Sequence, residues 1–295
     1  MKERARRNTL RKVDLVMWTK NGERTLRTVL SRIDQVIPED SVNQRIIIDD
    51  GSTDRTRDIA RSFGWAVIDN KGHGIPDAAN TALSHVVTER FISFEQDLLL
   101  DRKWWDNVPP LLDDPKVVVA SGVRVPDRPS GLRITHEYIL ERQISKMSDQ
   151  TQYSSVGKTS DNTIYRTGFV RQIGGFPKLR FREGIDVFVA RRVFEMGLIW
   201  RVSFGTKSFH LRQGLTQELM HHYWYGGCRR ELHRLMGSDV YANFPKAVLI
   251  SLKSPLVGLH GAFVKSCPQI LYIYPLMRLF ALIGEIRPYL YGGKP

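Results

Sequence analysis

Three short segments place carboxylates or small residues directly after apolar runs. The first reads IIIDDGSTD from residue 46, so a run of isoleucines delivers Asp49 and Asp50 into a turn. Either carboxylate can accept hydrogen bonds from a nucleobase or a ribose, Gly51 permits close approach of a ligand, and Ser52 can cap a following helix. A turn that only caps a helix would carry the same residues.

The second segment, NKGHGIPDAAN, spans Asn70 to Asn80 and is rich in small residues. Glycine at position 72 and the alanines further on would let the start of a helix approach a ligand, and free N–H groups at that start favour anionic groups. A plain transition from loop to helix with small packing residues fits equally well.

The third segment, Glu95-Gln96-Asp97, follows the apolar run Phe91–Phe94. Two carboxylates around one intervening residue can share a hard cation such as Mg²⁺ or Mn²⁺, which prefers oxygen ligands. Such a cation would neutralise a diphosphate and help it to leave. A solvated acidic turn at the end of a strand would look the same.

The order and spacing of these segments resemble the family 2 glycosyltransferases, including the dolichyl- and polyprenyl-phosphate sugar transferases. The family's T-x-N, DDGSxD, N-x-G-x-x-x-A-x-N and DxD motifs correspond to Thr19–Asn21, Asp49–Asp54, Asn70–Asn80 and Glu95–Asp97. Glu95 replaces the usual Asp and is one methylene longer. The resemblance covers roughly residues 13–200 and implies a GT-A fold.

The resemblance also implies roles for individual residues. The residues expected to bind the nucleotide-sugar are Thr19, Asn21, Asp49, Asp50, Gly51, Ser52, Lys71, Gly72, Asn80, Glu95, Gln96 and Arg212. The expected ligands of Mg²⁺ or Mn²⁺ are Asp97, Glu95 and His210. A single histidine beside a strand is also common as a structural residue, and the guanidinium of Arg212 suits phosphate oxygens.

Family members carry a G-G-F turn followed by a helix with an E-D-x-D-L motif, which supplies the general base. This chain has Gly174–Pro177 and then Glu183, with Gly184 in place of the second acid. Glu183 and Asp186 are three residues apart, so they would share a face of the helix predicted from residue 181 to 196. Both are therefore candidate catalytic bases. An anionic phosphate acceptor would need no strong base, and a salt-bridged helix start is the structural alternative.

Strands alternate with helices along the first half of the chain. Strands are predicted at Val13–Trp18, Arg45–Ile48, Ala66–Ile68, Phe91–Phe94 and Val117–Ala120, and helices at Thr25–Val36, Asp54–Phe63, Ala78–Val87 and Ile134–Met147. This alternation predicts an α/β fold with a mostly parallel sheet flanked by helices. Ligands of such sheets bind beyond the carboxyl ends of the strands, where the acidic segments fall.

The net charge of +13 lies at the two ends of the chain. Residues 1–12 carry an excess of five basic residues and residues 201–295 an excess of eight. Basic ends beside the apolar stretches Ala247–Val264 and Ile270–Ile283 favour attraction to anionic lipid over nucleic acid. Charge and proline interrupt both stretches, so interfacial helices are expected, as for the segment His221–Tyr225; a soluble basic surface or one membrane span is the alternative.

These observations predict a basic tail at 1–12, a GT-A domain at 13–205 and a membrane-associating extension at 206–295. The predicted enzyme is an inverting glycosyltransferase that acts on a polyprenyl phosphate or a lipid-linked glycan at the inner, cytoplasmic face of the cell membrane. The chain has two cysteines and no CxxC spacing, which predicts a reducing compartment and neither a disulfide framework nor a structural zinc site.

Two other classes of protein remain open. A sugar-nucleotide pyrophosphorylase would carry a glycine-rich phosphate loop after the first strand, which Trp18–Gly22 is not. A non-catalytic module that binds nucleotide-sugars is compatible with Glu95 and Gly184 at motif positions.

Overall fold

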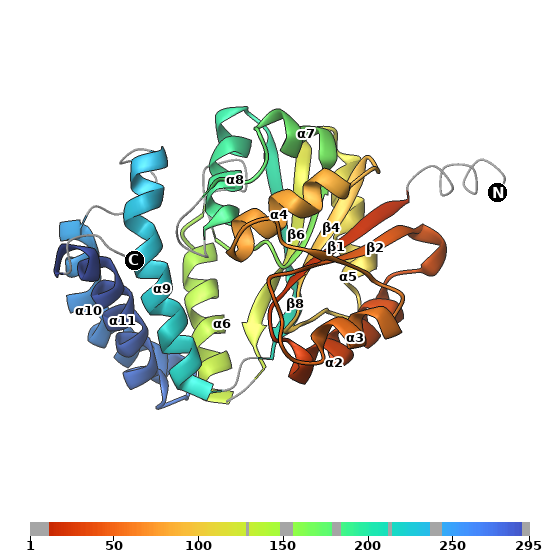
Figure 1. The fold of residues 1–295 in the computed structure, drawn as a ribbon. Coiled ribbons are helices and arrows are strands. Elements are labelled where there is room, and N and C mark those ends of the chain that lie inside the picture. Colours follow the sequence, from red (N-terminus) through yellow and green to blue (C-terminus); the bar gives the residue numbers. More distant parts are fainter. Residues whose placement is uncertain are drawn as a thin grey trace. The chain divides into compact units, whose positions relative to one another are not determined.

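The computed structural model describes residues 12–127, 130–147, 156–178, 184–211, 214–236 and 244–290 (Figure 1). The chain forms two compact units, which we call the sheet unit and the helical unit. The sheet unit comprises Met1–Arg124, Ser148–Lys178 and Ile185–His210. The helical unit comprises Val125–Met147, Leu179–Gly184 and Leu211–Pro295.

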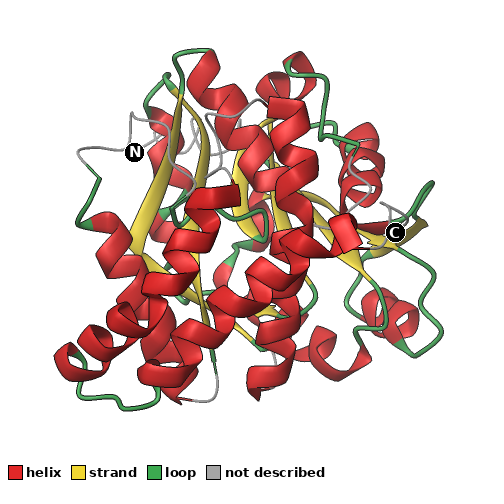
Figure 2. Cartoon of the chain, turned by 90° about the vertical axis from the view of Figure 1, so that its left-hand side faces the viewer, coloured by secondary structure: helices red, strands yellow, loops and turns green. Residues whose placement is uncertain are grey.

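The sheet unit is organised around one eight-stranded sheet with the order β3-β2-β1-β4-β7-β6-β8-β5. The strands are β1 (Val13–Thr19), β2 (Val42–Asp49), β3 (Ala66–Asp69), β4 (Arg90–Glu95), β5 (Leu98–Leu99), β6 (Val117–Pro126), β7 (Asn162–Arg166) and β8 (Ile199–His210). β1 pairs in parallel with β2 and β4, whereas β7 is antiparallel to β4 and β6. Figure 2 shows the strands in yellow.

Helices cover both faces of the parallel half of this sheet. They are α2 (Glu23–Val36), α3 (Thr56–Ser62) and α4 (Gly74–His85), and Figure 1 shows α2 and α3 together on one side of the strands and α4 on the other. All seven residues of β1 are buried, as expected of a central parallel strand covered on both faces. The short helices α5 (Trp104–Asn107) and α7 (Thr167–Gln172) and the longer α8 (Ile185–Glu195) complete the unit.

The predicted mixed α/β fold is confirmed, and each strand and helix predicted up to residue 147 is present with its ends shifted by a few residues. β7 and β8 were not predicted. The helix predicted from residue 181 begins at Ile185, because Gly184 has a φ of +102°, outside the helical region. Glu183 lies outside the described residues, so its position relative to Asp186 stays a prediction.

The helical unit consists of α6 (Ser130–Ile144), α9 (Gly214–Met236), α10 (Phe244–Val264) and α11 (Ile270–Leu290), and α11 packs against the other three. Leu132, Leu219, Ile273 and Met277 form one buried cluster of this unit. α9 and α11 approach closely at two glycines: a Cβ on Gly226 would collide with the backbone of Ala281, and one on Gly284 with the backbone of Tyr223.

Helix α10 exposes much of its apolar surface. Among the described residues it is the one helix long and apolar enough to cross a membrane, a test that a core helix of a soluble protein can also pass. By length and composition α10 is compatible with the alternative of one membrane span, and the expected interfacial helix stays a prediction. The predicted domain boundary at residue 205 lies inside β8, and the division at 13–205 stays a prediction.

Candidate functional site

The carboxyl ends of β1, β2 and β4 meet at one edge of the sheet. Register pairs Thr19 with Asp49 and Trp18 with Glu95, so the first and third segments emerge on either side of the end of β1. This is the edge at which ligands of parallel α/β sheets bind. The sequence segments that were identified separately therefore converge.

The carboxylate of Asp49 makes its contacts within the protein. Its carboxylate is buried, accepts hydrogen bonds from the Ser52 N–H (2.9 Å) and from the hydroxyls of Ser52 and Thr19, and lies 3.5 Å from the guanidinium of Arg57. A carboxylate with this many partners holds the turn in shape. The side chain of Ser52 binds Asp49 rather than capping α3, and Asp54 accepts a hydrogen bond from the N–H of Thr56 at the helix start instead.

Asp50 is held at the rim of the same turn. Its Oδ1 accepts hydrogen bonds from the Asn70 amide (2.8 Å) and the Gly74 N–H (3.2 Å), and its Oδ2 lies 3.2 Å from the ammonium of Lys20. Burial on its own would raise the pKa of Asp50, but the hydrogen bonds from Asn70 and Lys20 outweigh it and the pKa is lowered. Asp50 is therefore an ionised acceptor beside the second motif.

The loop after β1 is locked onto the DDGS turn. The Asn21 N–H donates to the Ser52 hydroxyl, and Oδ1 of Asn21 accepts from the Thr53 N–H, both at 2.9 Å. Asn21 adopts a φ of +49°, which asparagine tolerates better than most residues. A Cβ placed on Gly51, with a φ of +78°, would meet no atom within 4 Å, so this glycine leaves open space where a ligand can approach.

Several predicted binding residues have structural partners. Both ends of the Gln96 amide bind the backbone of Lys20, at 2.8 and 2.9 Å. The Asn80 amide binds the backbone N–H and carbonyl of Phe176, both at 2.9 Å, and so ties the G-G-F turn to α4. The Gly72 N–H lies 3.3 Å from the side-chain oxygen of Asn70, and Lys71 is exposed to solvent.

Glu95, Asp97 and His210 converge at the end of β4, and we call them the strand-end cluster. β5 pairs with the end of β8 so that Leu98 lies opposite His210, which brings the histidine beside Asp97. Nε2 of His210 lies 3.0 Å from Oδ2 of Asp97, and one ligand atom from each of the three residues lies within 4.8 Å of the others. Two carboxylates and one imidazole in this arrangement fit a divalent cation such as Mg²⁺ or Mn²⁺.

Asp186 lies in the first turn of α8, where the carboxylate of Asp161 acts on it. Burial raises the pKa of its carboxyl and the negative charge of Asp161 adds to this rise, while the guanidinium of Arg124 opposes it. A carboxylate with a raised pKa is suited to accept a proton near neutral pH. Of the two candidate bases, this one lies among the described residues.

Three polar residues of this region were not predicted from the sequence: Arg124, Asp161 and Asn162. Arg124 donates to the fully buried Asp161 at 2.8 Å, and Asn162 pairs with Phe94 in the strand next to the third motif. The sequence does contain a hint, because the polar pair Asp161-Asn162 comes before the apolar residues of β7. This pair indicates a site only once β7 is recognised as a strand antiparallel to β4. Glu183 and Arg212, two of the predicted site residues, lie outside the described residues.

Comparison with solved structures identifies similar folds. A mannosyltransferase from Pyrobaculum calidifontis in complex with GDP-Man and Mn²⁺ aligns with a TM-score of 0.67 at 19% identity, over 97% of this chain and 89% of that chain. Glucosyl-3-phosphoglycerate synthase from Mycobacterium tuberculosis in complex with phosphoglyceric acid aligns with a TM-score of 0.54 at 17% identity, over 77% of this chain and 80% of that chain. At these identities the likeness concerns the fold.

A search of curated proteins returned no match. The family model described as glycosyl transferase family 2 matches residues 14–174, which is more than half of the 295 residues and includes the motifs from Thr19 to Asp97. The chain therefore belongs to glycosyl transferase family 2.

Proposed function

We propose that this enzyme transfers a sugar from a nucleoside-diphospho-sugar to a hydroxyl of a lipid-linked acceptor, with Mg²⁺ or Mn²⁺ bound by Glu95, Asp97 and His210. The observation that carries the proposal is the convergence of these three side chains beside the turn of Asp49 and Asp50. The solved relatives named above include complexes with GDP-Man and Mn²⁺ and with Mn²⁺ and UDP.

The donor would lie against the β1 and β2 ends. Asp50 is ionised and can accept from a base or a ribose, and the space beside Gly51 allows the nucleotide to approach the backbone. Asp49 and Asn21 would act indirectly by holding the turn. The bound cation would neutralise charge on the diphosphate.

The transfer itself forms one bond and breaks one bond. The acceptor oxygen attacks the anomeric carbon, the bond from that carbon to the diphosphate oxygen breaks, and the nucleoside diphosphate leaves with the electron pair. Asp186 takes the proton of the acceptor hydroxyl, a role that suits its raised pKa. Attack from the face opposite the leaving group inverts the anomeric centre.

A lipid interface is supported by the surface of α10. Exposed apolar residues recur every three or four positions along it, which places them on one face: Leu249, Leu252, Leu256, Leu259 and Phe263. Phe263 is 87% exposed. The surplus of basic residues in 201–295 would add attraction to anionic headgroups. We propose that this face lies on the inner leaflet.

Binding of the donor is tested by thermal unfolding with UDP, GDP, dTDP and CDP, each with and without Mn²⁺. A ligand at about 100 times its Kd stabilises the folded state by about 2.7 kcal/mol. We expect a stabilisation by one nucleotide that requires Mn²⁺. No stabilisation by any of the four would contradict the proposed donor site, and binding without turnover on any acceptor would favour a non-catalytic module.

The lipid interface is tested by sedimentation with vesicles of anionic or neutral lipid. We expect binding to anionic vesicles, weakened by Leu252→Asp and by Leu256→Asp. The matched control is Val87→Asp, because Val87 is 74% exposed, like Leu252 at 72%, but lies in the sheet unit. Equal binding by all three variants and the parent would remove the lipid interface from the proposal.

A further inference from the structure

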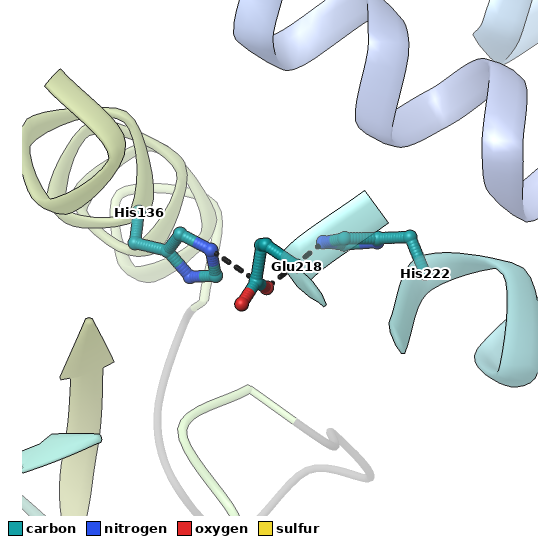
Figure 3. A group of neighbouring side chains, drawn as sticks. All are labelled: His136, Glu218 and His222. Atoms are coloured by element: carbon teal, nitrogen blue, oxygen red, sulfur yellow. Dashed lines mark ion pairs between the residues drawn. The ribbon is translucent and has the colours of Figure 1, made fainter. Parts of the chain in front are cut away.

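A second group of metal-binding side chains lies in the helical unit, which we call the helical cluster. His136 comes from α6, and Glu218 and His222 come from α9 (Figure 3). Nε2 of His136 lies 3.1 Å and Nε2 of His222 lies 3.5 Å from the same oxygen, Oε1 of Glu218. One ligand atom of each residue lies within 4.8 Å of the others.

Helix geometry brings these atoms together. Glu218 and His222 are four residues apart, so they lie on the same face of α9. His136 points toward the same carboxylate from α6, as Figure 3 shows. The Glu218 side chain is 5% exposed, whereas His136 is 26% exposed and forms the accessible edge of the cluster.

Ion pairing alone accounts poorly for this geometry. Both Nε2 atoms are buried, and both lie against the same carboxylate oxygen rather than against separate acceptors. To form two ion pairs, both imidazoles would have to be protonated side by side.

A metal cation would satisfy all three groups with both imidazoles neutral. Its coordinate bonds would use the two nitrogen lone pairs and the carboxylate. Two imidazoles and one carboxylate match sites of Zn²⁺, which keeps a fourth position for water when the protein supplies three ligands. Imidazole-rich sites favour Zn²⁺ and its neighbours over Mg²⁺.

We propose that His136, Glu218 and His222 bind a divalent transition-metal cation of the Zn²⁺ class, which links α6 to α9 within the helical unit. The site is separate in its residues from the strand-end cluster and does not depend on the transferase reaction. Because the ligands come from two helices that are distant in sequence, binding is expected to stabilise the folded helical unit.

The experiment is a titration of the full-length, metal-free protein with Zn²⁺, followed by dialysis and measurement of bound metal. Asp97→Asn combined with His210→Gln removes the strand-end cluster and serves as the background. In that background we expect about one Zn²⁺ per chain and, with Co²⁺ as a probe, the visible absorption of a low-coordinate site that includes nitrogen ligands.

Separate variants His136→Gln, Glu218→Gln and His222→Gln identify the ligands. Changing a partner outside the ligand shell costs about 10–100-fold in metal affinity, so loss of a ligand is expected to raise the Kd for Zn²⁺ by about 100-fold or more. His233→Asn is the matched control, since His233 is a partly buried histidine of the same helix outside the cluster. It should bind Zn²⁺ like the background protein.

Circular dichroism shows whether each variant folds, and His136→Gln at the accessible edge remains informative if a change at the more buried Glu218 prevents folding. Loss of the Co²⁺ absorption and of bound Zn²⁺ in the folded cluster variants, with retention in the control, supports the site. No bound Zn²⁺ in the background protein, or equal binding by the folded variants and the background, overturns it.

Discussion

The strand-end cluster and the helical cluster reach similar local geometry from different donor sets. Glu95, Asp97 and His210 provide two carboxylates and one imidazole at the ends of strands. The helical cluster provides two imidazoles and one carboxylate from two helices. Oxygen-rich sites suit hard cations that bridge phosphates, whereas imidazole-rich sites suit transition metals. The two proposals together assign one cation to the chemistry of transfer and another to the structure of the helical unit.

The largest expected effect is on the strand-end cluster. Asp97→Asn should lower kcat/KM for sugar transfer by about 1,000-fold, because a metal ion supplies several kcal/mol of charge stabilisation and each 1.36 kcal/mol is a factor of ten. Steady-state kinetics with Mn²⁺ measures this. The exposed Asp106→Asn is the control and should leave kcat/KM unchanged. Equal activity of the Asp97 variant would exclude this cluster as the catalytic cation site.

The next effect concerns the proposed base, Asp186. Asp186→Asn should lower kcat by about 100-fold, which is the lower range for removal of a general base. The base works only when deprotonated, so kcat/KM of the parent should fall as pH falls through the raised pKa of Asp186, and this acidic limb should disappear in the variant. A near-normal kcat in the variant would point instead to a phosphate acceptor, which has no proton to lose.

The helical unit offers a test of stability. Gly226→Ala should destabilise the fold by about 3 kcal/mol, since the added methyl would meet backbone atoms of α11, including the carbonyl carbon of Ala281 at 2.8 Å. Gly168→Ala is the control, because its Cβ would meet nothing within 4 Å and alanine favours the helix. Urea unfolding measures both, and equal midpoints would show that α9 and α11 do not rely on this contact.

A smaller effect is expected where the chain departs from its family. Gly184→Asp restores the usual second acid but should destabilise the protein by about 2 kcal/mol, since Gly184 has a φ of +102° and its Cβ would lie 2.6 Å from Cδ1 of Leu232. We expect no gain in kcat. Wild-type stability together with faster transfer would mean that an acid is tolerated there and that Asp186 is not the main base.

The sequence was most informative where ligands stand in contiguous motifs. The mixed α/β fold and the grouping of Glu95 with Asp97 follow from apolar runs that end in acids, because the ends of parallel strands must meet. His210 was named from its position in the family pattern, and the structure brings it beside Asp97 through the pairing of β5 with β8. The roles of these residues as metal ligands stay predictions.

Other features depend on pairings that no local pattern reveals. Asp161 and Asn162 become visible only when β7 is placed antiparallel to β4. The prediction that no structural zinc site exists was argued from the cysteines alone and stays a prediction; it did not consider His136 and Glu218, which are distant in sequence and meet through helix packing. His222 was assigned to an interfacial helix, whereas its side chain faces Glu218.

The most direct test of the difference between the strand-end cluster and the helical cluster is calorimetric binding of UDP or GDP in the presence of Mn²⁺. It is measured on the parent, Asp97→Asn and His222→Gln. The account predicts tight, Mn²⁺-dependent binding of one nucleotide by the parent and by His222→Gln, and its loss in Asp97→Asn. Mn²⁺-dependent binding that survives in Asp97→Asn and disappears in a folded His222→Gln would contradict the assignment of the catalytic cation to the strand ends.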